Sequence, residues 1–381
     1  MSDGVQIFEG AIDKGLEGIV ACSTGISAIQ DTTLCYRGYT IEDLSENSTF
    51  EEVVYLLWNS RLPKTGELEA FKKSLNEAST LSPEFWNVLK AIPTKDVHPM
   101  AWLRTAISLS AHWDPEANDN SEAANQRKAI RLTGKIGTIV CAFEAIRKGQ
   151  DMPKPLAGKS IAWNFMSMVN GGKEPDAETV RIFDICLILH ADHELNCSAF
   201  ATRVTASSLS DIYSAVVSAI GALKGPLHGG ANEAVMRMLL QIGSIENAKQ
   251  FVKDALAAKE KVMGIGHRVY KHGDPRAAIL RKFSDSLTAK KGIHHLYEMS
   301  VLIDETMNKE KNLMPNVDFY SATVYHSLGI STDLFTPIFA VSRMSGWLAH
   351  AFEQYANNRI YRPRGRWTGP LGLKYAPINS R

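Results

Sequence analysis

The sequence predicts a mostly helical protein of two domains with a minor β segment near the N-terminus. Hydrophobic residues make up 45% and charged residues 22% of the 381 residues, a composition typical of a globular chain that buries a sizeable core. A single core stops growing at about 250–300 residues, so the length favours two domains. Apolar residues recur at helical spacing along most of the chain, which predicts that helices dominate.

The first elements follow from turn residues and a capping pattern. Residues 18–38 alternate short β-branched runs with Gly, Asp and Thr, which predicts one or two short strands or a hairpin. Thr49 and Glu52 have the spacing of a capping box, and the apolar residues behind them share one helical face. Pro63 ends that run, so we expect a helix between these signals.

The next segments predict core helices separated by a polar connection. Ser82-Pro83-Glu84 combines a cap, a proline suited to the first helical position and an acid in the first turn. Residues 98–110 and 129–146 are apolar on most sides, which indicates buried helices. Residues 114–126 are polar with few bulky side chains, so we expect an exposed connection there.

Helical patterns continue through the second half of the chain. Residues 210–223 predict a helix that is closed by Lys224-Gly225-Pro226. In the last predicted helix, Thr336-Pro337 should produce a kink. Further helices are expected at residues 232–242, 245–259, 280–287, 296–307 and 334–355.

Charge and composition exclude several classes of partner. Lys and Arg total 42 against 41 Asp and Glu, so a net charge of +1 provides no global field for nucleic acid or an anionic membrane. The most apolar stretches, such as residues 182–191, are shorter than the roughly 20 residues of a membrane helix. The acidic start lacks the pattern of a secretory signal, and five cysteines without a Cys-x-x-Cys pair fit a reducing compartment. We therefore expect a cytoplasmic protein.

One segment, residues 261–276, concentrates glycine, histidine and positive charge. Gly264 and Gly266 permit positive φ and a close approach of another molecule. His267 follows at once, and an Asp-Pro turn signal ends the segment. The cations that follow are Arg268, Lys271 and Arg276, so anions are the expected ligands.

Two further stretches carry candidate catalytic groups. His228 lies between a Gly-Pro helix stop and a new helix start, which places it in a loop rather than on an apolar helix face. Asp318 stands among Val317, Phe319 and Tyr320, whose bulk could partly desolvate a carboxylate. Desolvation raises a carboxyl pKa and strengthens the ionised form as a base, although a helix cap is the ordinary role of such an aspartate.

The motif at residues 190–194, HADHE, raises the possibility of a metal site. His190 and His193 are three residues apart and could share a helical face. A zinc site needs three or four ligands, and no second group of suitable ligands follows. We therefore expect no metal and carry a metal-dependent hydrolase only as a rival reading.

Four stretches together resemble the citrate synthase family in order and spacing. They are GPLHGGANE (225–233), VMGIGHRVYKHGDPR (262–276), NVDFYSATVYHSLGISTDLFTPIFAVSR (316–343) and NNRIYRPRGRWTGP (357–370). The resemblance covers nearly the whole chain and is closest to the bacterial-type dimeric enzymes. It implies an all-α citrate synthase fold in which a small helical domain is inserted into a large one. The implied boundaries are 1–226 and 327–381 for the large domain and 227–326 for the small domain.

The resemblance implies three catalytic residues. Asp318 matches the family's aspartate that removes a proton from the methyl carbon of acetyl-CoA. His228 matches the histidine that donates a hydrogen bond to the developing enolate oxygen. His267 matches the histidine that polarises the ketone of oxaloacetate. The implied reaction condenses acetyl-CoA, oxaloacetate and water to citrate and CoA, the entry step of the tricarboxylic acid cycle.

The resemblance also implies the substrate contacts. The oxaloacetate or citrate residues are His193, Arg276, Arg343 and Arg362, and Arg362 would cross the interface of a homodimer. Arginine suits this role because its planar fork pairs with carboxylates bidentately. The coenzyme A segment comprises Val262, Met263, Gly264, Ile265, Gly266 and Lys271. No cofactor is expected beyond coenzyme A as part of the acyl-CoA substrate.

Three other readings remain open on the sequence. The first is 2-methylcitrate synthase, or a bifunctional enzyme, because a pocket distinguishes one methylene by only about 1–3 kcal/mol. The second is the metal-dependent hydrolase, which chelation would inactivate. The third is a non-catalytic helical scaffold that binds CoA, which release of thiol from an acyl-CoA would exclude.

Overall fold

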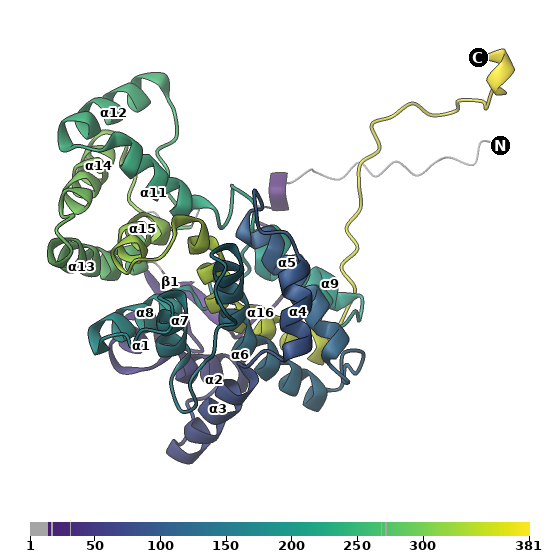
Figure 1. Cartoon of the computed structure of the whole chain (residues 1–381). Helices are drawn as coiled ribbons and strands as arrows, with labels where there is room; N and C mark the ends of the chain where they lie inside the picture. Colours follow the sequence, from purple (N-terminus) through teal and green to yellow (C-terminus); the bar gives the residue numbers. More distant parts are fainter. Residues whose placement is uncertain (1–13, 17, 31, 268, 271–272) are drawn as a thin grey trace. The chain divides into compact units, whose positions relative to one another are not determined.

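The computed structural model describes residues 14–16, 18–30, 32–267, 269–270 and 273–381. Helices dominate these residues, as Figure 1 shows, so the all-α prediction is confirmed. Contacts divide the chain into two units, one of residues 24–359 and one of residues 1–23 with 360–381. The predicted boundaries at residues 226 and 326 stay a prediction.

Sixteen α-helices lie within residues 24–359 of the described chain. The first ten are α1 (Ile41–Asn47), α2 (Phe50–Asn59), α3 (Thr65–Ala78), α4 (Pro83–Ala91), α5 (Pro99–Ser110), α6 (Glu122–Arg147), α7 (Ile161–Val169), α8 (Ala177–His190), α9 (Cys197–Ser207) and α10 (Ile212–Leu223). The remaining six are α11 (Ala231–Ile242), α12 (Ile245–Ala258), α13 (Pro275–Lys290), α14 (His295–Lys311), α15 (Val317–Ser327) and α16 (Phe335–Ala356).

A three-stranded antiparallel sheet forms the minor β segment. Its strands are β1 (Ser27–Gln30), β2 (Thr33–Tyr36) and β3 (Tyr39–Thr40), in the order β1-β2-β3. The expected hairpin is confirmed, and a third short strand extends it. Ser27 pairs with Tyr36 across β1 and β2, and both side chains are buried. The sheet thereby presents two hydroxyl groups to the protein interior.

The helix starts follow the capping signals of the sequence. Ser82 caps α4 by accepting the N–H of Phe85 at 3.2 Å, and Pro83 is the first helical residue. Thr49 caps α2 by accepting the N–H of Glu52 at 3.4 Å. In a complete capping box the Glu52 carboxylate would accept the backbone N–H of Thr49. Here it accepts a hydrogen bond from the hydroxyl of Ser48 at 2.7 Å instead. The caps thus set the helix starts.

The expectation of an exposed connection at residues 114–126 is wrong in part. Asp114 is buried and receives Arg131 in a bidentate pair, with N–O distances of 2.8 and 2.9 Å. The ammonium of Lys128 donates to the carbonyl of Asp119 at 2.6 Å, and α6 already begins at Glu122. Polar composition gave no signal of this burial because the partners lie on the next helix.

The reason for expecting a kink at Pro337 does not apply. Pro337 is the third residue of α16, in the first turn of the helix. A residue there has no intrahelical hydrogen bond to lose, so proline is tolerated. The helix runs from Phe335 to Ala356, and its residues 335–351 are all buried.

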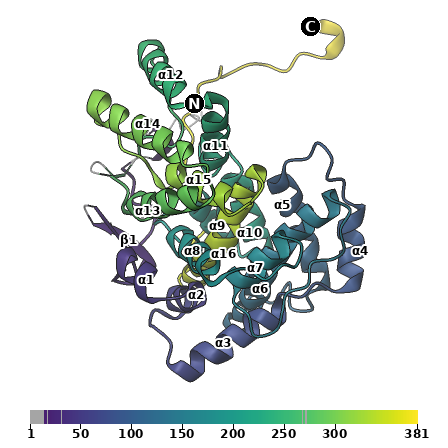
Figure 2. The ribbon, with the colours of Figure 1, turned by 60° about the vertical axis from the view of Figure 1, so that its left-hand side comes forward.

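Helix α16 is the centre of the larger unit. It packs against α9, α6, α10, α2 and α8, and the views in Figures 1 and 2 agree on this central place. The same figures show α11 to α15 as a group beside the other helices, and we call it the α11–α15 group. Within it α13 packs on α15, α11 on α15, and α12 on α14.

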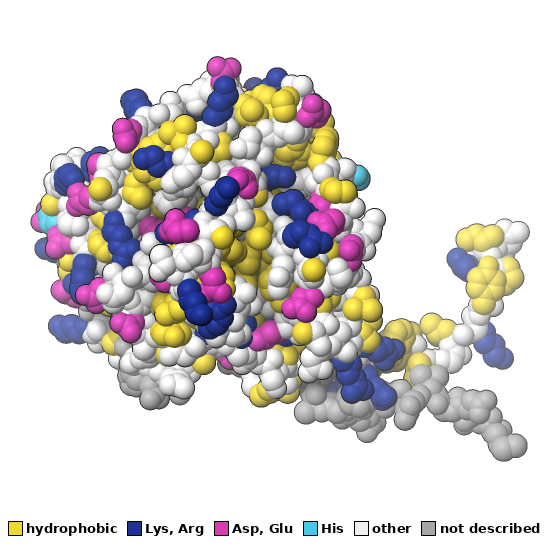
Figure 3. Space-filling view, turned by 90° about the horizontal axis from the view of Figure 1, so that it is seen from below, with side chains coloured by type: hydrophobic (Ala, Val, Ile, Leu, Met, Phe, Trp, Pro, Cys, Tyr) yellow, Lys and Arg dark blue, Asp and Glu magenta, His cyan; other side chains and the backbone are white. Residues whose placement is uncertain are grey.

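The surface carries mixed charge. Figure 3 shows basic and acidic side chains interspersed over one face of the molecule, in keeping with the net charge of +1. Among the described residues, no helix combines the length and the apolar character that crossing a bilayer would need. All five cysteines are free thiols, of which Cys141 and Cys186 are buried.

Candidate active site

His193 lies in the turn after α8, and hydroxyl groups of the sheet hold this turn. The Ser27 hydroxyl donates to the Asp192 carboxylate at 2.5 Å and accepts the N–H of Glu194 at 2.7 Å. The Tyr36 hydroxyl lies 3.0 Å from the carbonyl oxygen of Asp192. The turn is therefore fixed by buried polar contacts that need no substrate.

Helix α16 holds the same turn from the other side. The N–H of Gly346 donates to the carbonyl of Ala191 at 3.1 Å. A Cβ atom at Gly346 would stand 2.3 Å from Asp192 Oδ1, so only glycine permits this approach. His350 Nε2 lies 3.3 Å from the same oxygen, and both side chains are fully buried. The carboxylate of Asp192 thus links the turn to α16.

Charge compensation keeps Asp192 ionised. Burial acts to raise the pKa of this carboxyl, but His350, Arg343 and Ser27 outweigh it and hold the pKa below its usual range. His350 Nδ1 accepts a hydrogen bond from Arg203 Nε at 3.0 Å, which leaves the ring proton on Nε2, facing Asp192. The buried charges therefore form a connected set.

The ring of His193 faces the α11–α15 group. Its centroid lies 5.3 Å from that of His267 and 5.6 Å from that of Tyr270. Burial, followed by the cations Arg276 and Arg343, holds the pKa of His193 well below its usual range. His193 Nε2 is buried and has no hydrogen-bond partner among the described residues. A neutral imidazole with a ring nitrogen available thus stands at this place.

His267 is held in one tautomer by the backbone. Its Nδ1 accepts the N–H groups of Val269 at 3.0 Å and Tyr270 at 3.2 Å. The proton of the neutral ring must therefore sit on Nε2. Burial, and then Arg276, lower the pKa of His267 to about 4. The ring is a neutral hydrogen-bond donor at physiological pH.

The glycine segment before His267 pairs with the strand-like residues that lead into α15. The N–H of Gly266 donates to Met314 O at 2.7 Å, and the N–H of Asn316 donates to Gly264 O at 2.9 Å. Both glycines have positive φ, 76° and 93°, as the sequence indicated. A Cβ at Gly264 would stand 2.7 Å from Val235 and 2.9 Å from the ring of Phe319. The segment is thereby joined to the start of α15.

Asp318 is the second residue of α15 and does not cap it. Asn316 is the cap, since its side chain accepts the N–H of Asp318 at 3.0 Å. The carboxyl of Asp318 is buried, and its Oδ1 has no partner among the described residues. Burial raises its pKa to about 7, against the opposing effect of Arg276. The desolvation expected from the sequence is present, and the role of Asp318 as a base stays a prediction.

Arg276 has a buried carboxylate partner that the sequence reading did not identify. Its Nε and Nη2 donate to Asp274 Oδ1 and Oδ2 at 2.9 and 2.7 Å. Asp274 Oδ2 also accepts the N–H of Val317 at 3.0 Å. The pair joins the start of α13 to the start of α15, and so sets Arg276 beside Asp318.

Arg343 of α16 lies over an aromatic ring of the same helix. Its guanidinium carbon is 4.7 Å from the centroid of Phe339, and its Nε donates to the carbonyl of His190 at 2.7 Å. Burial lowers the pKa of Arg343 to about 10, although Asp192 opposes the shift. A buried cation of this kind favours an anionic partner.

His228 lies on another side of Phe339, with ring centroids 6.5 Å apart. Its Nε2 accepts the N–H of Ser198 at 3.3 Å and lies 2.8 Å from the Ser198 hydroxyl. The hydroxyl also accepts Trp347 Nε1 at 3.0 Å. Burial, and then Arg343, lower the pKa of His228 to about 4. The neutral ring therefore carries its proton on Nδ1.

The structure brings most of the predicted residues together. Contacts or electrostatic influence connect His193, His228, His267, Arg276, Arg343 and Asp318. Among the predicted CoA residues, Val262 is buried, and Met263 and Ile265 are partly buried against the core. Lys271 lies outside the described residues. Arg362 belongs to the unit of residues 1–23 and 360–381 and stays a prediction.

Several residues that build the site were missed. Asp274 is the carboxylate two residues before Arg276, and an Asp-Pro-Arg helix start gave a signal that was read only as a turn. Ser198 and Tyr270 act on the histidines through backbone N–H groups. Sequence gives no signal for such contacts because they depend on which segments meet.

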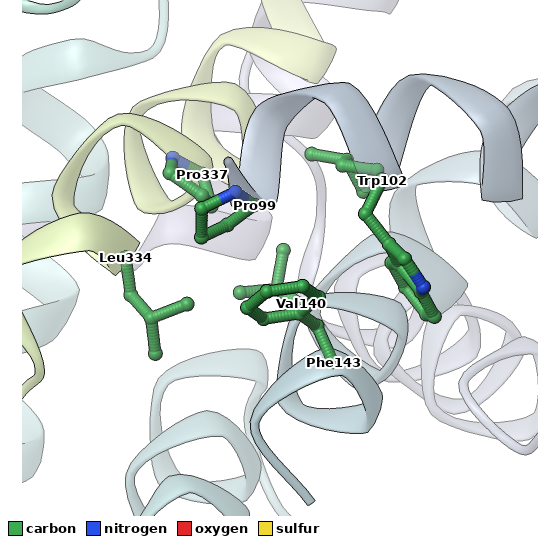
Figure 4. Close-up of a pocket in the computed structure, with 7 residues that line it drawn as sticks. Pro99, Trp102, Val140, Phe143, Leu334 and Pro337 are labelled. Atoms are coloured by element: carbon green, nitrogen blue, oxygen red, sulfur yellow. The ribbon is translucent and has the colours of Figure 1, made fainter. Parts of the chain in front are cut away.

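Other candidate sites are weaker. Figure 4 shows a small apolar hollow lined by Pro99, Trp102, Leu103, Val140, Phe143, Leu334 and Pro337. Its interior has no room for even a water molecule, and its lining lacks the polar groups of a ligand pocket, so this hollow does not fit a substrate. Within the described residues, no group of three His, Cys, Asp or Glu side chains could hold a metal ion.

A buried carboxyl group, three neutral histidines and two buried arginines form a candidate enzyme site that suits an anionic substrate. The family model described as "Citrate synthase, C-terminal domain" matches residues 15–364. Citrate synthase 2 of Bacillus subtilis is 55% identical over 368 residues, covering 97% of this chain and 99% of that protein. The chain belongs to the citrate synthase family and is an enzyme of that class.

Two further comparisons bear on the substrate. The citrate/2-methylcitrate synthase of Bacillus subtilis is 43% identical over 359 residues. These residues make up 93% of this chain and 96% of that protein. The citrate synthase of Thermoplasma acidophilum, solved as a ternary complex with carboxymethyl coenzyme A and oxaloacetate, has a TM-score of 0.92 and 30% identity to this chain. That match covers 97% of this chain and 99% of the solved one.

Proposed function

We propose that the protein condenses acetyl-CoA with oxaloacetate and water to give citrate and CoA. The main support for the proposal is the state of Asp318. Its carboxyl is buried, has a pKa of about 7 and is under the electrostatic influence of Arg276. The ternary complex of the Thermoplasma enzyme supports the choice of substrates. The reaction begins when Asp318 removes a proton from the methyl carbon next to the thioester.

His228 supports this first step. A carbon acid as weak as a thioester methyl needs a hydrogen bond to its developing enolate oxygen. His228 Nε2 is engaged by the N–H of Ser198, so Nδ1–H is the group that can donate to that oxygen. A neutral donor suits the step because it stabilises the enol without transferring a full charge into the site.

His267 and the arginines serve the second substrate. The enol carbon attacks the ketone carbon of oxaloacetate, and Nε2–H of His267 passes its proton to the ketone oxygen as the new carbon–carbon bond forms. The proton that Asp318 took from the methyl carbon makes up this loss, so the imidazole becomes neutral again and the carboxylate is regenerated. Arg276 and Arg343 pair with the two carboxylates of oxaloacetate. His193 forms a hydrogen bond with the same substrate through a ring nitrogen. Water then cleaves the thioester of the product, which releases citrate and CoA.

The glycine segment is the proposed CoA site. The N–H groups of Ile265 and Gly266 are paired with Val262 O and Met314 O, so a ligand would meet the N–H groups of residues 262–264. Gly266, whose positive φ favours glycine, keeps the backbone there free of a side chain. Lys271 would meet the phosphates. No cofactor besides the CoA substrate is part of this proposal.

Closure of two domains would exclude water during enolisation. We propose that residues 227–326 form the small domain and move against residues 1–226 and 327–381. His193 and Arg343 come from the larger part, whereas His267, Arg276 and Asp318 come from the smaller, so substrates would be enclosed as the parts meet.

The active assembly is proposed to be a homodimer in the cytoplasm. Helix α9 exposes Val204, and the turn after it exposes Leu209, which a second copy could cover. Five free cysteines suit a reducing compartment. Arg362 would complete the oxaloacetate site across the dimer. Mixing Arg362→Ala with Asp318→Ala chains should restore activity, and verified mixed dimers without restoration would refute the crossing.

The test measures release of CoA from acetyl-CoA and from propionyl-CoA, each with and without oxaloacetate. Oxaloacetate-dependent release with a higher kcat/KM for acetyl-CoA is expected. A higher value for propionyl-CoA would move the assignment to 2-methylcitrate synthase with the same residues. No release of CoA from either thioester would refute the proposed condensation. Loss of activity with a chelator would favour a metal-dependent reaction.

A further inference from the structure

A buried carboxylate that the proposed mechanism does not use lies five residues after His228. Glu233 is the third residue of α11, and its side chain is only 3% exposed. A carboxylate so deeply buried needs hydrogen-bond partners, because its loss of hydration is costly. Its partners come from three separate helices.

Two of the partners stand at the start of a helix. Thr336, the second residue of α16, donates its hydroxyl proton to Glu233 Oε1. His98 caps α5 through Nδ1, which accepts the N–H of Met100, so its Nε2 carries the proton and lies 3.5 Å from Glu233 Oε2. Three helix N-termini, those of α5, α11 and α16, therefore converge on one carboxylate, and their dipoles favour its negative charge.

Arg237 completes the set from within α11. Its Nη2 donates to Glu233 Oε2 at 3.1 Å. The same carboxylate thus joins the first helix of the α11–α15 group to α5 and α16, which lie outside that group. The junction falls where the loop of His228 connects the two.

The junction reaches the His228 loop through one atom. Thr336 Oγ1 is 3.3 Å from the carbonyl oxygen of Gly229, the residue after His228, and its single proton is shared between this oxygen and Glu233. Gly229 is packed tightly, since a Cβ there would stand 2.5 Å from the carbonyl oxygen of Leu223. A shift of Thr336 therefore moves the peptide next to the catalytic histidine.

Helix α16 also carries Arg343, whose charge acts on His228. Arg343 lies seven residues after Thr336, so both fall on one face of the helix. We propose that Glu233 is a positioning residue, which uses Thr336 to fix the His228 loop against the helix that carries Arg343. The inference rests on the proposed function, since it assigns Glu233 to the step in which His228 supports the enol.

The test compares two substitutions of one side chain. Thr336→Val keeps the shape but removes the hydroxyl, whereas Thr336→Ser keeps the hydroxyl. Thr336→Val should lower kcat roughly 10- to 100-fold, the cost of a small misplacement of a catalytic group, and Thr336→Ser should restore most of it. KM for oxaloacetate should stay within about twofold, because His193, Arg276 and Arg343 are untouched.

A matched control separates positioning from general destabilisation. Thr288 on α13 is equally buried, and its hydroxyl donates to the carbonyl of Ser284 at 2.6 Å. Thr288→Val should lower the unfolding temperature much as Thr336→Val does but leave kcat unchanged. If both valine variants lower kcat alike, the effect is structural and the inference is overturned.

A second variant covers the case in which Thr336→Val does not fold. Glu233→Gln removes the charge at constant shape, and it should lower kcat with the KM for oxaloacetate unchanged. Kinetics are followed by CoA release from acetyl-CoA with oxaloacetate. If a folded Glu233→Gln protein had the kcat of the wild type, the inference would be overturned and the proposed function would stand. If the wild-type enzyme itself released no CoA, the proposed function would be overturned.

Discussion

The turn that carries His193 and the loop that carries His267 face each other but are fixed in different ways. The turn is held by buried side chains, since Ser27 and His350 both engage the carboxylate of Asp192. The loop is held by backbone pairing, in which Gly266 and Gly264 exchange hydrogen bonds with the residues before α15. One half of the site is a polar network in the core, and the other is a short strand-like contact.

This difference separates two tasks. The turn belongs to the larger set of helices and presents His193 without help from a ligand. The loop is joined to Asp318 and Arg276, because Asp274 and Asn316 connect all three at the start of α15. We infer that substitutions in the turn act mainly on stability and those in the loop group mainly on turnover.

The largest effect is expected at Asp318. Asp318→Asn removes the base at nearly constant shape, so kcat should fall roughly 10³-fold while oxaloacetate still binds. CoA release gives kcat, and calorimetric titration gives the oxaloacetate affinity. Asp254→Asn, at an exposed position of α12, serves as the control and should be unchanged. Equal losses of binding and turnover would make Asp318 structural.

The raised pKa of Asp318 also predicts a pH dependence of stability. The pKa of this carboxyl is about 7 in the folded protein and 3.8 in its ordinary, exposed state. Unfolding therefore releases a proton at any pH between these two pKa values. The free energy of unfolding therefore falls as pH rises from about 4 to 7 and then levels off. Asp318→Asn should lack this part of the fall. Asp184, whose pKa burial also raises to about 7, contributes equally to both proteins.

Activity should follow the same group in the opposite direction. The base must be ionised, so kcat/KM for acetyl-CoA should rise as pH increases through about 7 and then reach a plateau. His228 and His267 stay neutral across this window because their pKa values are about 4. A profile that is flat from pH 5 to 8 would contradict the assignment of the base.

The next effect is expected at Asp192. Asp192→Ala leaves His350 and Ser27 without their buried partner, so the free energy of unfolding should fall by roughly 3–5 kcal/mol. Urea denaturation measures the loss, and Asp192→Asn should recover part of it because it still accepts one hydrogen bond. A loss similar to that of an exposed aspartate would show that the network is not what fixes the turn.

The sequence predicted more of the fold than of the site's supports. Helix boundaries followed from local signals such as Ser82-Pro83 at α4, because a cap and a first turn depend on neighbours in sequence. The burial of Asp114 was missed, since its partner Arg131 lies on the following helix. Local pattern thus gives elements but not the contacts between them.

The site shows the same division. Candidate residues such as His228 and Asp318 stood out by their loop position or apolar neighbours, and the resemblance supplied their roles. The tautomers of His228 and His267 could not be predicted, because backbone N–H groups of Ser198 and Tyr270 fix them. Those contacts exist only after the segments meet.

Effects of intermediate size are expected at two glycines, one in contact with the His193 turn and one beside the His267 loop. Gly346→Ala would push a methyl group against Asp192 in the His193 turn, and Gly264→Ala would push one against Val235 and Phe319 beside the loop. We expect Gly346→Ala to lower stability and raise KM for oxaloacetate. Gly264→Ala, with φ at 76°, should raise KM for acetyl-CoA more than that for oxaloacetate. Steady-state kinetics with each substrate varied would show the split, and identical patterns would erase the distinction.

The smallest effect is expected at the ion pair between Lys290 of α13 and Glu178 of α8. It joins the α11–α15 group to the other helices, but its side chains are 58% and 50% exposed. Solvent screens such a pair and its two long side chains lose entropy, so Lys290→Met should leave KM for oxaloacetate within about twofold. The unfolding midpoint should also stay unchanged. A large rise in KM that disappears at high salt would mean that this exposed contact, rather than the buried groups around Asp318, holds the two halves of the site together.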